Sequence, residues 1–283
     1  MQTNVTLIAD SGSTKTDWCV IDQNNVTLEI STQGINPFHQ PEDIISDILS
    51  KELLPQLGDI VPQELHFYGS GCNIENAEML CGLLSALFPE PCQINVYNDL
   101  LGAARALCGT SSGIACILGT GVNSCLYDGT RIVKNVPPLG YILGDEGSGA
   151  VLGKHFLNAV YKGFLPHVIR QQLEEHLSMN YQQIISRVYR KPMANRFLAS
   201  LAPFIHSHLH IPVVRGIVVS NFREFFRRNV IPYGNHTLPL GVVGSIAFFF
   251  SDELREAARL EGCSISKILR SPMPGLVEYH SKT

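Results

Sequence analysis

Short apolar runs alternate with longer segments in which apolar residues recur at helical spacing. Runs rich in β-branched residues, bounded by turn residues, predict strands at 5–10, 17–22, 26–31, 64–69 and 92–97. Helical spacing predicts helices over 41–54 and 75–88, and another that begins at Asn98 or Asp99. The first part of the chain therefore follows the order strand, strand, strand, helix, strand, helix.

The same order then recurs. Strands are predicted at 114–118, 122–127 and 130–136, a helix from about 149, and helical segments over 166–228. A strand at 238–243, a helix through 255–260, a strand at 265–269 and a short helix over 274–280 follow. This order predicts an α/β fold of two duplicated βββαβα domains, 1–110 and 111–283, with a helical insertion at about 160–230. Two such domains would flank an interdomain cleft, a common place for a ligand.

Composition narrows the classes of partner. The 283 residues are 45% hydrophobic and 16% charged, as in globular proteins, and the length suits two domains. The formal net charge of −4 comes without a basic block, so neither a nucleic acid nor a membrane surface is an expected partner. A phosphate ligand stays compatible with this charge, because a local loop can bind it.

The expected compartment is a reducing cytoplasm. The first residues lack the pattern of a secretory signal, and no apolar run approaches the ~20 residues that span a bilayer. The eight cysteines are scattered without a C-x-x-C pair, which argues against a zinc site or a disulfide framework.

The stretch "DSGSTKT" joins the first two predicted strands. Its glycine permits a tight turn with backbone N–H groups open to a ligand, its hydroxyls and lysine are donors, and its aspartate suits a hydrated magnesium ion. These residues are Asp10, Gly12, Ser13, Thr14, Lys15 and Thr16. An ordinary hairpin turn explains the stretch equally well.

Two further glycine turns occur at related positions of the second half. "LGTGVNS" (118–124) lies between two predicted strands, and "GVVGSIA" (241–247) joins a predicted strand to a helix. Each turn alone is weak evidence, but three in a duplicated fold favour nucleotide binding.

Carboxylates mark two other segments. Asp99 in "VYNDLLGAA" is either a helix N-cap or a general base aimed at a substrate hydroxyl, and the local sequence favours the cap. Asp145 and Glu146 lie among the glycines of "LGDEGSG", where they either complement a helix dipole or bind sugar hydroxyls. Asn36 and Gly71 lie in loops that turn chemistry or a ligand would explain equally well.

Four segments together resemble the phosphate, sugar and adenosine motifs of the N-acetylglucosamine kinases, which belong to the superfamily of sugar kinases, actin and heat-shock chaperone ATPases. The segments are 10–16, 118–124, 143–149 and 244–247, and the resemblance runs from the first strand to the terminal helix. It implies two ribonuclease-H-like domains, with ATP and Mg²⁺ as cofactors. It also implies phosphorylation of the 6-hydroxyl of an amino sugar, above all N-acetylglucosamine.

The resemblance implies a role for each matching residue. Asp10 would position magnesium, and Asp99 would be the catalytic base. ATP phosphates would lie near Ser13, Thr14, Lys15, Thr120 and Gly121, and adenosine beside Gly244 and Ser245. The sugar would contact Asn36, Gly71, Asp99, Asn123, Gly144 and Asp145.

One segment departs from the family pattern. Relatives carry a Gly-Gly-Trp-Gly-like approach to "GDEG", which helps to shape the sugar pocket, whereas this chain has Pro137-Pro138-Leu139-Gly140. The sugar is therefore left open between N-acetylglucosamine, N-acetylmuramic acid and other hexose derivatives, and a homodimer is one option for assembly. Two other functions are alternatives for this chain: an ATPase that activates a partner enzyme, and a sugar or nucleotide sensor without turnover.

Overall fold

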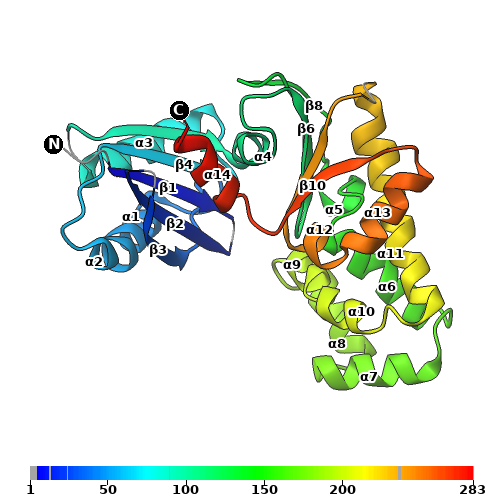
Figure 1. The fold of residues 1–283 in the computed structure, drawn as a ribbon. Coiled ribbons are helices and arrows are strands. Elements are labelled where there is room, and N and C mark those ends of the chain that lie inside the picture. Colours follow the sequence, from blue (N-terminus) through cyan, green and yellow to red (C-terminus); the bar gives the residue numbers. More distant parts are fainter. Residues whose placement is uncertain (1–4, 13, 24, 89, 235–236, 283) are drawn as a thin grey trace. The chain divides into compact units, whose positions relative to one another are not determined.

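The computed structural model of the chain describes residues 5–12, 14–23, 25–88, 90–234 and 237–282. The chain divides into two compact units. Unit 1 comprises Met1–Ser111, Gly129–Arg131 and Ser271–Thr283, and unit 2 comprises Ser112–Asp128 and Ile132–Arg270. Each unit is built around its own five-stranded mixed sheet (Figure 1).

The sheet of unit 1 has the order β3-β2-β1-β4-β5. Its strands are β1 (Val5–Ser11), β2 (Lys15–Asp22), β3 (Asn25–Gln33), β4 (Glu64–Gly69) and β5 (Gln93–Asn98). The first three strands form antiparallel neighbours, and β4 and β5 extend the sheet in parallel with β1.

Helices cover the sheet of unit 1 on both faces. Leu7 and Ala9 of β1 pack in a core with residues of α1, η1 and α3, and Ile8, which points to the opposite face, is also fully buried. Burial on both faces explains why β1 reads as a continuous apolar run. The helices of unit 1 are α1 (Glu42–Ile48), the π-helical η1 (Leu49–Leu53), α2 (Leu54–Leu57), α3 (Ile74–Leu87), α4 (Asp99–Cys108) and α14 (Met273–His280).

The sheet of unit 2 repeats this topology with the order β10-β9-β6-β7-β8. Its strands are β6 (Gly113–Leu118), β7 (Val122–Tyr127), β8 (Ile132–Asn135), β9 (Leu240–Val243) and β10 (Ile265–Leu269). Here too the central strand is antiparallel to its successor, and the last two strands run parallel to it. The recurring order confirms the predicted duplication.

Most of the helices belong to unit 2. The segments before β9 are α5 (Gly140–Leu143), α6 (Gly149–Tyr161), α7 (His167–Leu177), α8 (Tyr181–Tyr189), α9 (Ala194–Ala199), α10 (Ala202–Ser207), α11 (Pro212–Phe225), η2 (Phe226–Val230) and η3 (Ile231–Tyr233). Between β9 and β10 lie α12 (Ser245–Phe249) and α13 (Ser251–Leu260). In the described part of the chain, no helix is long and apolar enough to cross a bilayer.

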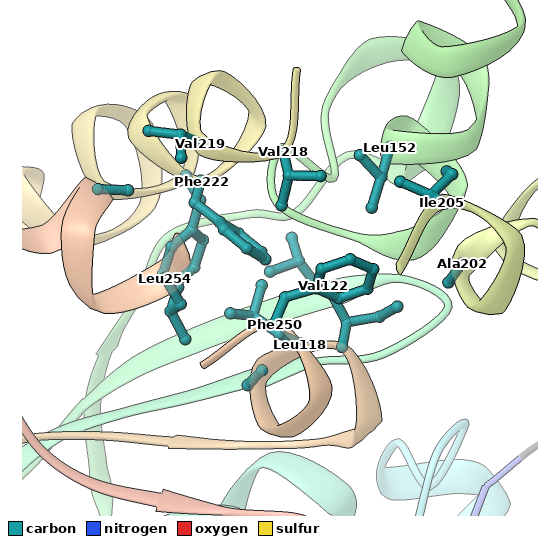
Figure 2. Packing of buried hydrophobic residues seen from close by; sticks show 14 of the residues in the cluster. Leu118, Val122, Leu152, Ala202, Ile205, Val218, Val219, Phe222, Phe250 and Leu254 are labelled. Carbon is teal, nitrogen blue, oxygen red and sulfur yellow. The ribbon is translucent and has the colours of Figure 1, made fainter. Parts of the chain in front are cut away.

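The core of unit 2 anchors the turn between its first two strands. Leu118 and Val122, which flank that turn, lie among Leu152 of α6, Phe222 of α11 and Phe250 (Figure 2). Because both flanking residues are buried, the turn between them is held firmly at both ends.

The terminal helix differs from the prediction. Residues 111–283 were expected to form the second domain, but α14 belongs to unit 1, where it packs against α4 and β1. The physical reason is a close helix–helix contact at Gly275, whose missing side chain lets α14 approach the backbone of Ala106.

Candidate functional site

Unit 1 brings its predicted site residues to one edge of the sheet. Ser11 is paired with Gly69, and Gly69 with Asn98, so the carboxyl ends of β1, β4 and β5 lie in one row. Asp10 precedes the first position of this row and Asp99 follows the last. In open α/β sheets this edge is where ligands bind.

The turn between β1 and β2 is tight and polar. The N–H of Gly12 donates to the carbonyl of Lys15 at 3.0 Å, and the N–H of Gly34 donates to the carbonyl of Thr14 at 3.1 Å. The Nζ of Lys15 lies 2.6 Å from a carboxylate oxygen of Asp17 at the surface. Ser13, also predicted to contact phosphate, lies outside the described residues.

Thr16 faces the interior. Its Oγ1 lies 2.6 Å from the Oγ of Ser11, and both hydroxyls accept the N–H of Ile35 at 3.1 Å. Ser11 also donates to the Ile35 carbonyl at 2.8 Å, and Thr16 to that of Gln33 at 3.2 Å. This buried network fixes the loop that carries Asn36. Ser11 was missed because its partner Ile35 is 24 positions away.

Asn36 and Gly71, two of the predicted sugar contacts, lie together. Gly71 has φ +80°, and a Cβ there would lie 3.0 Å from the Cγ of Asn36, so glycine is required for this approach. The amide nitrogen of Asn36 donates to Ser70 at 3.2 Å, and its Oδ1 accepts the N–H of Phe38 at 3.0 Å. The Asn36 side chain is therefore held in one orientation, with 8% of the residue exposed.

Asn98 caps helix α4, and the interpretation of Asp99 as the cap is wrong. The Oδ1 of Asn98 accepts the N–H of Leu101 at 2.8 Å, which satisfies the helix end. Asp99 occupies the first turn, where the positive end of the helix dipole stabilises a carboxylate. Because the neighbour serves as cap, the Asp99 carboxyl group is not committed to that task.

The pKa values of both acids at this edge are raised. Burial, then the Asp99 and Asp17 carboxylates, raise the pKa of Asp10 to about 7, against the effect of Lys15. Burial also raises the pKa of Asp99, although backbone N–H groups of Leu100 and Asp99 oppose the rise. A carboxyl group with a raised pKa is suited to accept a proton near neutral pH.

This carboxylate pair fits a magnesium ion. Mg²⁺ keeps several waters and uses one or two carboxylates rather than a full protein cage. Among the described residues no cluster of three or more His, Cys, Asp or Glu forms such a cage. Asp10 offers the single carboxylate that a hydrated ion needs, and a nearby cation would offset the repulsion between Asp10 and Asp99.

In unit 2 the turn "GTG" is attached to the start of helix α6. The N–H of Gly119 donates to the Gly121 carbonyl at 3.0 Å. The N–H groups of Gly149 and Ala150 donate to the carbonyls of Gly119 and Thr120 at 2.8 and 3.2 Å. Thr120 is exposed at the tip. The turn therefore presents a fixed backbone beside an exposed hydroxyl.

Asp145 lies against this turn. Its Oδ1 accepts the N–H of Val122 at 3.4 Å, and a Cβ on Gly121 would lie 3.2 Å from its Oδ2. Asp145 adopts φ +57°, and its N–H donates to the Pro138 carbonyl at 2.8 Å. Burial raises the pKa of Asp145 to about 6, although the hydrogen bond from Val122 opposes the rise. Strained backbone at such a carboxylate is typical of binding loops.

The other predicted sugar contacts of unit 2 are placed around the same turn. The Oδ1 of Asn123 accepts the N–H of Ser124 and the amide of Asn135, both at 2.9 Å. Gly144 is buried, and its Cα lies so close to the Pro138 carbonyl that a side chain would collide with it. Asn123 is thus oriented by its neighbours, and Gly144 permits the bend before Asp145.

Within unit 2, the glycine turn at 241–247 contacts the turn at 118–124. Gly244 has φ +127° and precedes α12, and a Cβ there would collide with the carbonyl of Leu118. The adjacent Ser245 is exposed at the start of the helix. Within unit 2 the turns at 119–121 and 244–245 therefore lie side by side, as one nucleotide site requires.

Asn221 is a supporting residue that the sequence analysis missed. It is buried in α11, where its Oδ1 accepts the N–H of Gly147 at 3.2 Å and its amide donates to Ser148 at 3.4 Å. The available signal was a polar residue at helical spacing among Val214, Val218 and Phe225. A buried amide on an apolar helix face needs such partners.

The segment that departs from the family pattern is exposed and strained. Leu139 has φ +63° and is 63% exposed, and it is the N-cap residue directly before the short helix α5. The carbonyl of the preceding Pro138 holds the N–H of Asp145. The segment thus shapes the Asp145 loop through its backbone.

Comparison with known proteins identifies relatives of the whole chain. No family model matches, and none of the curated proteins compared with the chain matches. A solved structure of a candidate N-acetylglucosamine kinase from Porphyromonas gingivalis is 46% identical, with 98% of this chain and 99% of that chain covered and a TM-score of 0.96.

More distant structures share the fold. A candidate N-acetylglucosamine kinase from Chromobacterium violaceum has 16% identity and a TM-score of 0.77, with 98% of each chain covered. Component A of the Acidaminococcus fermentans (R)-2-hydroxyglutaryl-CoA dehydratase has 11% identity and a TM-score of 0.52, with 99% and 97% of the two chains covered. The identity to the Porphyromonas protein extends over nearly the full length of both chains. The chain therefore belongs to the family of N-acetylglucosamine kinases, which are ATP-dependent sugar kinases.

Proposed function

We propose that the protein transfers the γ-phosphoryl group of ATP to the 6-hydroxyl of an amino sugar, with N-acetylglucosamine as the substrate. The bond between the γ-phosphorus and its bridging oxygen breaks, a bond to the sugar oxygen forms, and the products are ADP and the sugar 6-phosphate. The observation that carries this proposal is the pair of partly buried carboxyl groups, Asp10 and Asp99, at the ligand-binding edge of unit 1.

Asp99 is proposed as the general base. Its carboxyl group lies at the start of α4 with the capping task left to Asn98, and burial raises its pKa. It would accept the proton of the sugar hydroxyl as that oxygen attacks the phosphorus. Asn36 and Asp145, each held in one orientation by hydrogen bonds, are proposed to bind other sugar hydroxyls.

The nucleotide is proposed to bind through the glycine turns. Gly12, Thr14 and Lys15 in unit 1, and Thr120, Gly121, Gly244 and Ser245 in unit 2, supply backbone N–H groups, hydroxyls and one cation suited to phosphate and ribose oxygens. Asp10 would hold the magnesium ion, which when bound neutralises charge on the phosphates. The backbone turns are preorganised, so the donors need little rearrangement.

ADP release across a panel of sugars tests the proposal. The panel contains N-acetylglucosamine, N-acetylmuramic acid, glucosamine, N-acetylmannosamine and glucose, each with ATP and Mg²⁺. We expect ADP release that depends on the sugar and is fastest with N-acetylglucosamine. Release with none of them would overturn the kinase proposal, and sugar binding without ADP release would indicate a sensor. A different preferred sugar would overturn the assigned substrate alone.

A further inference from the structure

The C-terminal helix packs directly on the helix that carries Asp99. A Cβ on Gly275 of α14 would lie 2.7 Å from the Cα of Ala106 and 2.8 Å from its carbonyl carbon. Real Cβ atoms do not approach so closely, so the two backbones are in contact at this point. Figure 1 shows α14 and α4 as neighbours within unit 1.

One turn before this contact, α4 is fitted just as closely to the sheet. A Cβ on Gly102 would lie 2.9 Å from the Cδ1 of Tyr68 and 3.0 Å from its Cβ. Helix α4 is therefore held at two neighbouring points, by Tyr68 of β4 at Gly102 and by α14 at Ala106. Glycine at both contacts leaves no side chain to act as a spacer.

A chain of hydrogen bonds joins the three elements. A terminal nitrogen (Nη1) of Arg105 in α4 donates to the hydroxyl of Tyr68 at 2.7 Å, and that hydroxyl lies 2.8 Å from the Nε2 of His280 in α14. Arginine can only donate, so the Tyr68 proton is free to be donated to a neutral His280. Burial, then His66 and Arg105, lower the pKa of His280 to about 3, which keeps the imidazole neutral.

Aromatic rings complete the enclosure of Arg105. Its guanidinium carbon lies 4.4 Å from the ring centre of Tyr97 in β5 and 5.1 Å from that of Tyr279 in α14. The ring of His66 stacks on His280 with centres 3.9 Å apart. The Arg105 side chain is thus fixed by groups from β4, β5 and α14 at once.

We propose that His280 is a positioning residue for Asp99: through Tyr68 and Arg105 it holds α4 in the place that aims the Asp99 carboxyl group at the substrate. The proposal rests on the proposed sugar kinase function. Arg105 lies six positions after Asp99 in the same helix, a rise of about 9 Å, so a lateral shift of the helix at Arg105 displaces Asp99 as well.

The test compares three variants in the full-length protein. His280→Ala removes the acceptor of the Tyr68 hydroxyl, whereas His280→Gln offers an amide oxygen near the position of Nε2. Lys282→Ala is the matched control, because Lys282 lies beyond the end of α14 and pairs only at the surface with Glu278. The measurements are kcat and KM for sugar and for ATP, and amide hydrogen exchange in α4.

We expect His280→Ala to lower kcat by about 10- to 100-fold, to leave the KM for ATP nearly unchanged and to speed exchange in α4. His280→Gln should restore most of kcat, and Lys282→Ala should match the wild type. If His280→Ala does not fold, Tyr68→Phe replaces it, since it removes the hydroxyl and keeps the ring. Tyr68→Phe should then show the same loss of kcat.

Two results would overturn the positioning role. One is a wild-type kcat in His280→Ala or Tyr68→Phe, which lack the hydrogen bond between Tyr68 and His280. The other is unchanged exchange in α4 together with a loss of kcat that glutamine does not restore. A wild-type protein that phosphorylates no sugar would instead overturn the proposed function, while exchange in α4 would still report whether His280 holds the helix.

Discussion

The two sheets share one topology but present different chemistry at their carboxyl edges. Unit 1 has Asp10 near the end of β1 and Asp99 directly after β5, whereas unit 2 has Ile117 at the corresponding place in β6 and Arg270 directly after β10. The edge of unit 1 is therefore acidic. The edge of unit 2 is built from glycine turns, whose backbone groups are fixed by the starts of α6 and α12.

This difference suits the two copies of the fold to separate tasks. Paired carboxyl groups with raised pKa values suit proton transfer and cation binding. Rigid backbone turns suit the recognition of phosphate and sugar oxygens. The scaffold holds the strand ends, and the few residues after each strand decide the chemistry.

The largest expected effect follows from removing the proposed base at the edge of unit 1. Asp99→Asn should lower turnover of N-acetylglucosamine by about 10²- to 10⁴-fold, because the neutral amide cannot accept the proton. ATP affinity, measured by calorimetry, should stay nearly unchanged. Asp47→Asn is the control, since this exposed carboxylate pairs with Lys51 on the surface of α1. Near-normal turnover of Asp99→Asn would contradict the assignment.

The acidic edge should also make the ligand-free fold sensitive to pH. The unfolded chain loses the Asp10 proton near its ordinary pKa of 3.8, whereas the folded chain keeps it up to about pH 7. The free energy of unfolding should therefore fall as pH rises through this window, by about 4 kcal/mol from this group. Urea titrations of Asp10→Asn should lack that part of the fall.

Asp47→Asn is the control for the pH experiment, because this exposed carboxylate pairs with Lys51 on the surface of α1. It should keep the slope of the wild type. A slope that Asp10→Asn leaves unchanged would argue against a buried, repelled carboxyl group at the edge of unit 1.

In unit 2 the edge of the sheet depends on a glycine turn, so a substitution of its glycine should lower stability. Gly244→Ala should lower the stability of unit 2 by about 2 kcal/mol and weaken ATP binding, because of its φ of +127° and the carbonyl of Leu118. Gly216→Ala, in α11 with open space around it, should instead raise stability by about 0.5–1 kcal/mol. Because the single tryptophan, Trp18, lies in unit 1, circular dichroism is the suitable probe. Equal effects of the two substitutions would contradict this account.

The smallest expected effect concerns the strained residue before the Asp145 loop. Leu139→Gly removes the conformational strain of a leucine at positive φ. Glycine also raises the entropy of the unfolded chain, which offsets part of this gain, so the free energy of unfolding should rise by about 0.5 kcal/mol. Thermal unfolding with and without sugar would measure it. A loss of stability would mean that the exposed leucine side chain makes contacts that outweigh the strain.

The sequence predicted the bounds of strands better than the contacts between elements that are distant in the chain. The strands at 64–69, 122–127 and 265–269 have the predicted bounds, because apolar runs between turn residues are local signals. The unit to which α14 belongs was not predictable, since its contact with α4 joins Gly275 to Ala106 across most of the chain.

The residues of the candidate site were also easier to predict than their contacts. The glycine turns and carboxylates are visible as motifs, but the partners of Thr16 and the capping of α4 by Asn98 are not. Two adjacent residues could each cap the helix, and only the backbone geometry decides between Asn98 and Asp99. The raised pKa of Asp99 likewise depends on burial, and that of Asp10 depends on burial and on carboxylates brought close by the fold.

A crystal structure with N-acetylglucosamine, Mg²⁺ and a non-hydrolysable ATP analogue tests the central claim most directly. The account predicts the 6-hydroxyl oxygen of the sugar within about 3 Å of the Asp99 carboxyl group. The same oxygen should lie in line with the terminal phosphorus of the analogue and its bridging atom. A sugar bound with another hydroxyl at Asp99, or with its 6-hydroxyl facing a different carboxylate such as Asp145, would contradict it.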